Sequence, residues 1–415
     1  MPTIQERKRQ IVTAVDRLMP EAWALARRIF DLKEVSGEER ESARLLTDRL
    51  VAAGASVERG IAGLPTAFCA SFGSGTPRIA LLAEYDALPD LGHACGHHLS
   101  GTASVFAAAA LAESGIFPNM AGIASPRPPV GARNDSRGGT LDVIGTPMEE
   151  AGGGKILMLE RGVFSGVDAV LMTHTSNETR AAYRTAAAQG FRITLTGGSS
   201  AHEWRSRNIM DVLLDMLNGI RVVENRAGVG TQILWVIPEG GEQNNVLPKR
   251  VVVDLGIWSF DDATLQRTVE RIRSRVQSAV AGTTTAAAME PNESLYLPLE
   301  PSEPLVAAFE RSLMALGMSF EPRRGHLFDA TDVGNVSHVV PTLHADVFLA
   351  GLKDHTPEYA VAGNGPAGER YLRTATAALA LTTFDLLRDP DDIARAKKQL
   401  AEREQPKELK PGRLP

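Results

Sequence analysis

Two patterns of apolar and polar positions follow one another along the first part of the chain. Apolar residues at helical spacing predict helices, and short continuous apolar runs predict buried strands. The expected helices cover 1–30, 36–53, 99–115 and 154–164, and the expected strands cover 66–72, 78–85, 140–146 and 168–174. Ser36 followed by Glu39 predicts a capping-box start for the second helix. Strands and helices that alternate at this length predict an α/β layer with a largely parallel central sheet.

The pattern changes after about residue 182. Strands are expected at 189–197, 231–237, 250–258 and near 289–298, and helices at 209–226 and 262–280. The order strand–helix–strand–strand–helix–strand predicts a ferredoxin-like α+β domain. The α/β pattern returns from about residue 299, with a strand at 343–351 and a last helix at 368–387. We therefore expect residues 186–296 to be inserted into a domain made of 1–185 and 297–402, followed by a flexible tail at 403–415.

Composition and charge narrow the classes of function. The 415 residues are enough for two or three domains, and 43% apolar and 23% charged residues are ordinary values for a soluble globular protein. A net charge of −6 without a one-signed block argues against nucleic acid or an anionic membrane as a partner. No stretch approaches the roughly 20 apolar residues that span a bilayer. The first helix also lacks the apolar core of a signal peptide.

The two cysteines of the chain, Cys69 and Cys95, could in principle form a disulfide. So few cysteines without a secretion signal instead indicate a reducing cytoplasm. Cys95 is then available as a thiolate ligand.

Metal-binding residue types gather after the strand expected at 78–85. Residues 93–98 contain His93, Cys95, His97 and His98. Other polar groups also follow apolar strands: Glu84 and Asp86, Glu149 and Glu150, His174, and Asp354 with His355. They are expected to converge because the carboxyl ends of parallel strands meet at one edge of a sheet. Thiolate, imidazole and carboxylate together suit Zn²⁺ or Mn²⁺, and two adjacent ions need roughly five or more protein ligands.

Each of these residues also has an ordinary interpretation. Cys95 and His97 could be buried core residues, and Glu149 and Glu150 could be a solvated helix start, since acidic residues are common in a first turn. Their combined placement after successive strands favours metal binding.

Seven groups of motifs occur in an order that resembles the dinuclear-metal amidohydrolases. The motifs are AEYDALP with GHACGH, GTPMEEAGGGK, LMTH, GGSSAH, NNVLP, ATDVGNVS and HTPEYAV. The family includes aminoacylases, plant auxin-conjugate hydrolases and p-aminobenzoyl-glutamate hydrolase, and the resemblance covers nearly the whole chain. It implies a metallopeptidase-like catalytic domain at 1–185 and 297–402, and a lid and dimerisation domain at 186–296.

The resemblance also implies roles for individual residues. Two divalent transition-metal ions, Mn or Zn, are expected to be bound by Cys95, His97, Glu150, His174 and His355. Glu149 is expected to be the general base, and Asp86 to orient a ligand. His202, in its own site or that of the partner in a homodimer, would donate a hydrogen bond to the developing oxyanion, and Asn245 would hold substrate.

Three departures from the family bear on the substrate. His98 replaces the usual Asp or Asn, the loop after His202 is shorter, and Trp258 replaces an arginine that grips the free carboxylate of the substrate. An indole in place of a guanidinium clamp favours a flatter, aromatic ligand. Arg205 or Arg207 could supply a replacement charge, or could be solvated surface residues.

These observations predict a metal-dependent hydrolase that cleaves a C–N bond in a small, aromatic substrate. The specific reaction expected is aryl-amine hydrolysis of the 5-nitroanthranilate aminohydrolase type, which releases ammonia. The alternative is amide hydrolysis of N-acyl amino acids or aminobenzoyl-glutamate-like conjugates. A further alternative is a non-catalytic metal-binding homologue, although an intact Glu149 argues against it.

Overall fold

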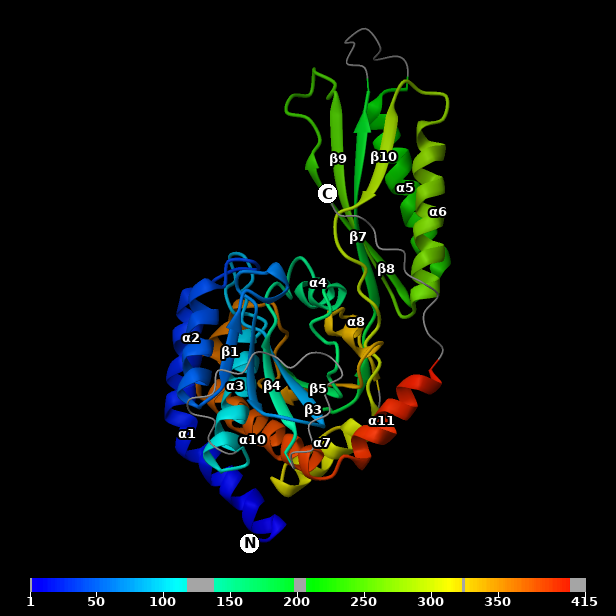
Figure 1. The fold of residues 1–415 in the computed structure, drawn as a ribbon. Helices are drawn as coiled ribbons and strands as arrows, with labels where there is room; N and C mark the ends of the chain where they lie inside the picture. The colour runs from blue at the N-terminus through cyan, green and yellow to red at the C-terminus, as the bar shows by residue number, and fades with distance from the viewer. Residues whose placement is uncertain (1, 118–137, 198–206, 323–324, 404–415) are drawn as a thin grey trace. The chain divides into compact units, whose positions relative to one another are not determined.

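The computed structural model describes residues 2–117, 138–197, 207–322 and 325–403. These residues form two compact units, each with its own apolar core (Figure 1). Unit 1 contains the described residues of Met1–Tyr183, Glu300–Gly325 and Asn335–Gln405, and unit 2 those of Arg184–Leu299 and His326–Gly334. Of the tail expected at 403–415, residues 404–415 lie outside the described residues. Among the helices of the described residues, none has the length and apolar character required to cross a membrane.

Unit 1 is built on a six-stranded sheet with the order β1-β2-β4-β3-β5-β12. The strands are β1 (Ser56–Arg59), β2 (Phe68–Gly73), β3 (Arg78–Ala83), β4 (Thr140–Gly145), β5 (Ala169–Ser176) and β12 (Thr342–Phe348). Strands β4, β3, β5 and β12 run parallel to one another, whereas β2 pairs antiparallel with both β4 and β1. The largely parallel sheet expected from the sequence is confirmed.

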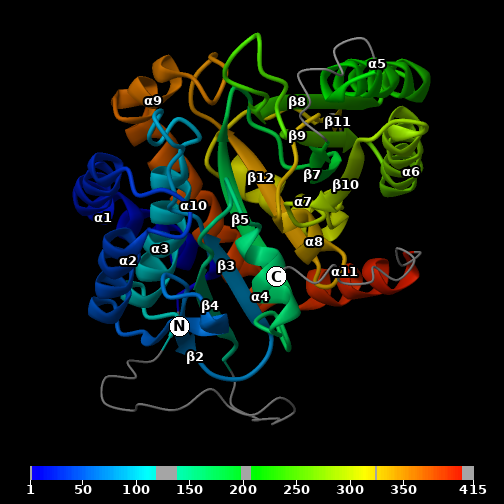
Figure 2. The same ribbon diagram turned by 90° about the horizontal axis from the view of Figure 1, so that it is seen from above.

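Helices cover both faces of this sheet. One face packs against the cluster of α1 (Ile4–Leu32), α2 (Arg40–Ala52), α3 (His97–Glu113) and α10 (Pro366–Arg388). Figure 2 shows α4 (Gly154–Glu160) on the other side of the sheet from α3 and α10. The remaining helices of unit 1 are the short 3₁₀ helix Ile61–Gly63, α7 (Glu303–Ala315), α9 (Pro357–Gly363) and α11 (Asp391–Glu402), and α8 (Val333–Ser337) lies where the chain returns to unit 1.

Helix α3 is buried on all sides, which its run of alanines and other small residues permits. It packs directly on the strand carrying the first polar cluster. A Cβ atom at Gly101 would lie 2.0 Å from the carbonyl oxygen of Glu84, so only glycine allows this approach. The start of α3 is thereby fixed against the end of β3.

The predicted capping box at the start of α2 is wrong. The helix begins at Arg40, and its N-cap residue, Glu39, makes no side-chain cap hydrogen bond. The Ser36 hydroxyl donates instead to Asp86 Oδ2, over 2.7 Å. A tertiary hydrogen bond has therefore replaced the local one that the sequence pattern suggested.

Unit 2 is a four-stranded antiparallel sheet with the order β10-β7-β9-β8. Its elements in chain order are β7 (Ala187–Thr196), α5 (Ile209–Ala227), β8 (Thr231–Glu239), β9 (Arg250–Ser259), α6 (Asp262–Val280) and β10 (Ala286–Pro291). Both helices pack on one face of the sheet, where alternate residues of β7 and β9 are buried. This is the predicted ferredoxin-like arrangement, although the closing strand begins three residues before the expected segment. The short strands β6 (Tyr183–Arg184) and β11 (Gly325–His326) lie where the chain passes between the units.

Candidate metal centre

The candidate centre lies in unit 1, at the carboxyl ends of its parallel strands. Glu84 and Asp86 follow β3, Glu149 and Glu150 follow β4, and His174 lies near the end of β5. His355 belongs to the loop after β12, and its backbone N–H donates to the carbonyl oxygen of Ala94 over 3.0 Å. Parallel strand direction therefore brings these segments together, as the sequence predicted.

The turn that carries Cys95 depends on Gly96. Gly96 has a φ of 87°, and a Cβ atom there would lie 2.4 Å from Thr175 Oγ1. The Thr175 hydroxyl donates to the Cys95 carbonyl oxygen over 2.7 Å. Because His174 precedes Thr175 on β5, one strand end holds both the Cys95 turn and a second donor residue. Cys95 Sγ and His174 Nε2 are consequently 3.3 Å apart.

Asp86 contacts two of the predicted donor residues, His97 and Glu150. Its Oδ1 atom lies 3.0 Å from His97 Nδ1, and its Oδ2 atom accepts the backbone N–H of Glu150 over 3.0 Å. A carboxylate beside Nδ1 places the ring proton on that nitrogen and leaves the Nε2 lone pair for a cation. The predicted orienting role of Asp86 has the contacts that it requires.

The turn that carries Glu149 and Glu150 begins at Met148, whose φ of 66° is unusual for a residue with a side chain. The buried carboxylate of Glu39 accepts the Met148 N–H over 3.0 Å. A Cβ atom at Gly154 would lie 1.8 Å from the Pro147 carbonyl oxygen. The glycine at position 154 therefore allows close backbone packing beside this turn.

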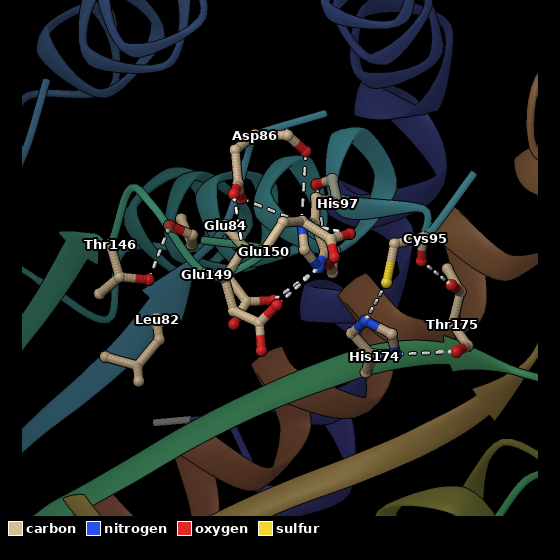
Figure 3. Close-up of polar contacts among 12 residues, drawn as sticks. Leu82, Glu84, Asp86, Cys95, His97, Thr146, Glu149, Glu150, His174 and Thr175 are labelled. Atoms are coloured by element: carbon tan, nitrogen blue, oxygen red, sulfur yellow. Dashed lines mark hydrogen bonds and ion pairs between the residues drawn. The ribbon is translucent and has the colours of Figure 1, made fainter. Parts of the chain in front are cut away.

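The predicted donors form two sets that share one residue. Cys95 groups with His97 and His174, and it groups separately with Glu150 and His355; within each set the donor atoms lie within 4.8 Å of one another. Figure 3 shows Glu84, Glu149 and Glu150 on one side of His97, with Cys95 and His174 on the other. One thiolate common to two sets suits two neighbouring cations.

Buried polar atoms at the centre also indicate that these residues can hold cations. Among the described residues, His97 Nε2 and Glu150 Oε1 are buried and have no hydrogen-bond partner. Burial without a partner costs free energy, and a cation would satisfy both atoms. His174 donates from Nδ1 to the Thr175 carbonyl oxygen over 2.9 Å, so its Nε2 atom also presents a lone pair.

Burial and neighbouring charges shift the pKa values of several side chains at the centre. Burial raises the pKa of the Cys95 thiol well above its ordinary value, so cation binding has to displace a proton there. Burial also lowers the pKa of His174 to about 4, with a further contribution from His97, which keeps the ring neutral and able to bind a cation. Burial opposes ionisation of Asp86, but hydrogen bonding and charge interaction with His97 lower its pKa to about 2.

The predicted substrate residues belong to unit 2 or lie outside the described part of the chain. His202 and Arg205 are among the residues left undescribed. Asn245 is exposed in a turn, and exposed Arg207 forms an ion pair with Asp215. Trp258 lies on the sheet face opposite α5 and α6, and its indole ring folds back over Gly256.

Sequence reasoning missed two contacts beside the donors. Lys155 is completely buried, and its Nζ atom lies 2.6 Å from Glu84 Oε1. His344 had no recognisable partner in the sequence, but its Nδ1 atom contacts the Tyr183 hydroxyl, which donates to Asp346 Oδ1 over 3.0 Å. The sequence offered only a lysine directly after a glycine run as a signal for the Lys155 contact, and its burial and its partner come from the structure.

Comparison with known proteins identifies the family. No protein-family model matches the chain. The Xaa-Arg dipeptidase of Mus musculus is 30% identical over 410 residues, covering 94% of this chain and 91% of the mouse protein. The chain belongs to the M20 family of dinuclear-metal peptidases and amidohydrolases. This M20 protein is therefore a metal-dependent hydrolase that acts on carbon–nitrogen bonds, as predicted.

Two further similarities agree with the family. A p-aminobenzoyl-glutamate hydrolase component of Escherichia coli is 30% identical to the M20 protein over 321 residues, covering 71% of this chain and 63% of that protein. A dinuclear metal-binding M20 peptidase of Bacillus subtilis has a TM-score of 0.67 at 18% identity, covering 90% of this chain and 99% of the other. The second comparison supports the fold.

Proposed function

We propose that the protein hydrolyses the amide bond of a dipeptide or an N-acyl amino acid, using two divalent cations. The observation that carries the proposal is the pair of donor sets sharing Cys95, in a chain of the M20 family. Zn²⁺ and Mn²⁺ both suit thiolate, imidazole and carboxylate donors, and the donor set does not distinguish them. When bound, such cations lower the pKa of water and polarise a carbonyl group.

Glu149 is the proposed general base. Its Oε2 atom lies 3.8 Å from His97 Nε2, next to the donor residue Glu150. A carboxylate at this position can accept a proton from the attacking water and later deliver it to the leaving nitrogen. Asp86 and Thr175 act through other residues: the first orients His97, and the second fixes the Cys95 turn. His202 and Asn245 keep their predicted substrate contacts as part of this proposal.

Amide hydrolysis replaces aryl-amine hydrolysis as the favoured reaction. The names of the mouse and Escherichia coli relatives describe a dipeptidase and an aminobenzoyl-glutamate hydrolase, and neither describes removal of an aryl amine. The comparisons thus favour the alternative formulated from the sequence over its main prediction. Trp258, on which the aromatic substrate was argued, is a residue of unit 2 whose ring contacts its own strand.

A substrate panel tests the proposal. The metal-loaded protein is incubated with Xaa-Arg and other dipeptides, N-acetyl amino acids, p-aminobenzoyl-glutamate and 5-nitroanthranilate. Release of a free amino acid is expected, and ammonia release from the aryl amine alone would refute amide hydrolysis. Glu149→Gln should bind the same number of metal ions and lose at least about 100-fold in kcat, the usual scale of a general base. A variant with unchanged kcat would exclude Glu149 from proton transfer.

We also propose that two copies associate through unit 2. Strand β8 is an edge of its sheet, and it exposes Leu234, Val236 and Ile237 at 53%, 63% and 44%. An open edge strand with exposed apolar side chains is a template for pairing with another chain. These exposed residues support association through this edge.

A further inference from the structure

A further carboxylate, outside the predicted set of five donors, the general base and Asp86, lies at the metal centre. Glu84 follows the last residue of β3 and is 1% exposed. Its Oε2 atom is 3.5 Å from His97 Nε2, the nitrogen that Asp86 leaves available for a cation. Two donors on one zinc ion, each at about 2.0–2.1 Å, are about 3.3 Å apart in tetrahedral geometry. The observed separation therefore fits two atoms that share an ion.

Both atoms of this close pair need a partner. Among the described residues, neither Glu84 Oε2 nor His97 Nε2 has a hydrogen-bond partner, and both atoms are buried. A buried carboxylate oxygen and a buried imidazole nitrogen that face each other would both be satisfied by a cation.

Lys155 fixes the other oxygen of the same carboxylate. Its Nζ atom lies 2.6 Å from Glu84 Oε1, and both side chains are at most 1% exposed. The backbone of Glu84 is held as well, since its carbonyl oxygen packs against Gly101 of α3. With one oxygen held by Lys155 and the backbone fixed, Oε2 is left directed at His97.

Stability alone gives no reason for this ion pair. Replacement of a buried pair by apolar side chains is often neutral or stabilising, because both charges lose their hydration. Beside a cation site, such a pair has a functional explanation, because the lysine neutralises the negative charge of the carboxylate before the cation binds.

We propose that Glu84 is a sixth protein donor to the metal centre, contributing Oε2 to the ion held by His97, and that Lys155 positions it. The inference deepens the proposed function and rests on the two-cation centre described there. It concerns metal affinity in the first place, so it can be tested without a substrate.

The experiment compares metal binding to full-length, metal-depleted protein and variants, using Zn²⁺ in competition with a chromogenic chelator and Co²⁺ absorption spectra. Glu84→Gln should weaken one of the two Zn²⁺ sites by about 10-fold or more and alter the Co²⁺ spectrum. Lys155→Met keeps the Glu84 carboxylate but releases its Oε1 atom, so it should weaken the same Zn²⁺ site by less than Glu84→Gln does. The double variant Glu84→Gln/Lys155→Met, which leaves no unpaired charge, should bind as weakly as Glu84→Gln.

A matched control is the ion pair of buried Asp142 with partly exposed Arg78, whose Oδ2 and Nε atoms are 2.6 Å apart in the same unit. Asp142→Asn should lower the Tm without changing Zn²⁺ affinity or the Co²⁺ spectrum. The inference is overturned if Glu84→Gln, or the double variant should the single one not fold, behaves in the same way as this control. If the unmodified protein itself binds no transition-metal ion, the proposed function fails first and the inference fails with it.

Discussion

The contacts of Asp86 predict by how much its replacement by asparagine will weaken metal binding. Asp86 receives three donors: His97 Nδ1–H on Oδ1, and the Ser36 hydroxyl and the Glu150 N–H on Oδ2. Asparagine offers only one acceptor oxygen. If that oxygen keeps the two donors on the Oδ2 side, the amide NH₂ faces His97 and requires the other tautomer, with the proton on Nε2. That nitrogen can then no longer bind a cation.

The expected loss of Zn²⁺ affinity in Asp86→Asn can be calculated from the same contacts. Loss of a hydrogen bond to a charged group costs about 1.5–3 kcal/mol, which corresponds to roughly 10- to 100-fold in affinity. We therefore expect Asp86→Asn to weaken Zn²⁺ binding by about this factor in chelator competition, with the fold preserved by circular dichroism. Ser36→Ala removes one donor and leaves both carboxylate oxygens, so it should weaken binding by less than about 10-fold. Binding by Asp86→Asn within about threefold of the unmodified protein would refute the reasoning.

Two other expectations concern stability and assembly. Burial lowers the pKa of His93 from 6.5 to about 4, so the unfolded chain binds the proton first as the pH falls. For the metal-depleted protein, this group should contribute about 3 kcal/mol to the free energy of unfolding above pH 6.5, lost as the pH falls toward 4. Urea titrations across that pH range should show a smaller loss in the free energy of unfolding for His93→Gln than for the unmodified protein. The same dependence of that free energy on pH in both proteins would contradict the assignment to His93. For assembly, Val236→Lys should convert a dimer to a monomer in light scattering; an unmodified protein that is already monomeric at micromolar concentration would exclude association through β8.

The sequence was sufficient for the layer arrangement because apolar periodicity records which face of each element is buried. In unit 2 the alternation along β9 places Val253, Leu255 and Ile257 on the core face, which is the pattern expected of a half-buried strand. The convergence of the donor residues was predictable for a related reason. Once the strands are parallel, every residue just past a carboxyl end reaches the same edge of the sheet.

Contacts between segments that are distant in the sequence were harder to predict from it. Ser36 has the right residue type for a helix cap, but a carboxylate 50 positions later binds its hydroxyl. His344 is separated by 161 positions from the tyrosine that it contacts. The burial of Lys155 depends on Glu84, and the sequence pattern shows neither the pairing nor its depth. In each case the tertiary fold determines the contact partner, and local sequence preferences contain no information about that partner.

The position of unit 2 within the chain has a consequence for biosynthesis. Cys95, His97, Glu150 and His174 all precede unit 2, whereas β12 and His355 follow it. A nascent chain that has emerged only through unit 2 carries the donor set of Cys95, His97 and His174 but lacks the set completed by His355. Its β5 edge is also uncovered, because β12 has not yet been translated. If His355 belongs to the second donor set, that set is complete only in chains whose translation has passed His355, and a shorter product exposes the unpaired edge of β5.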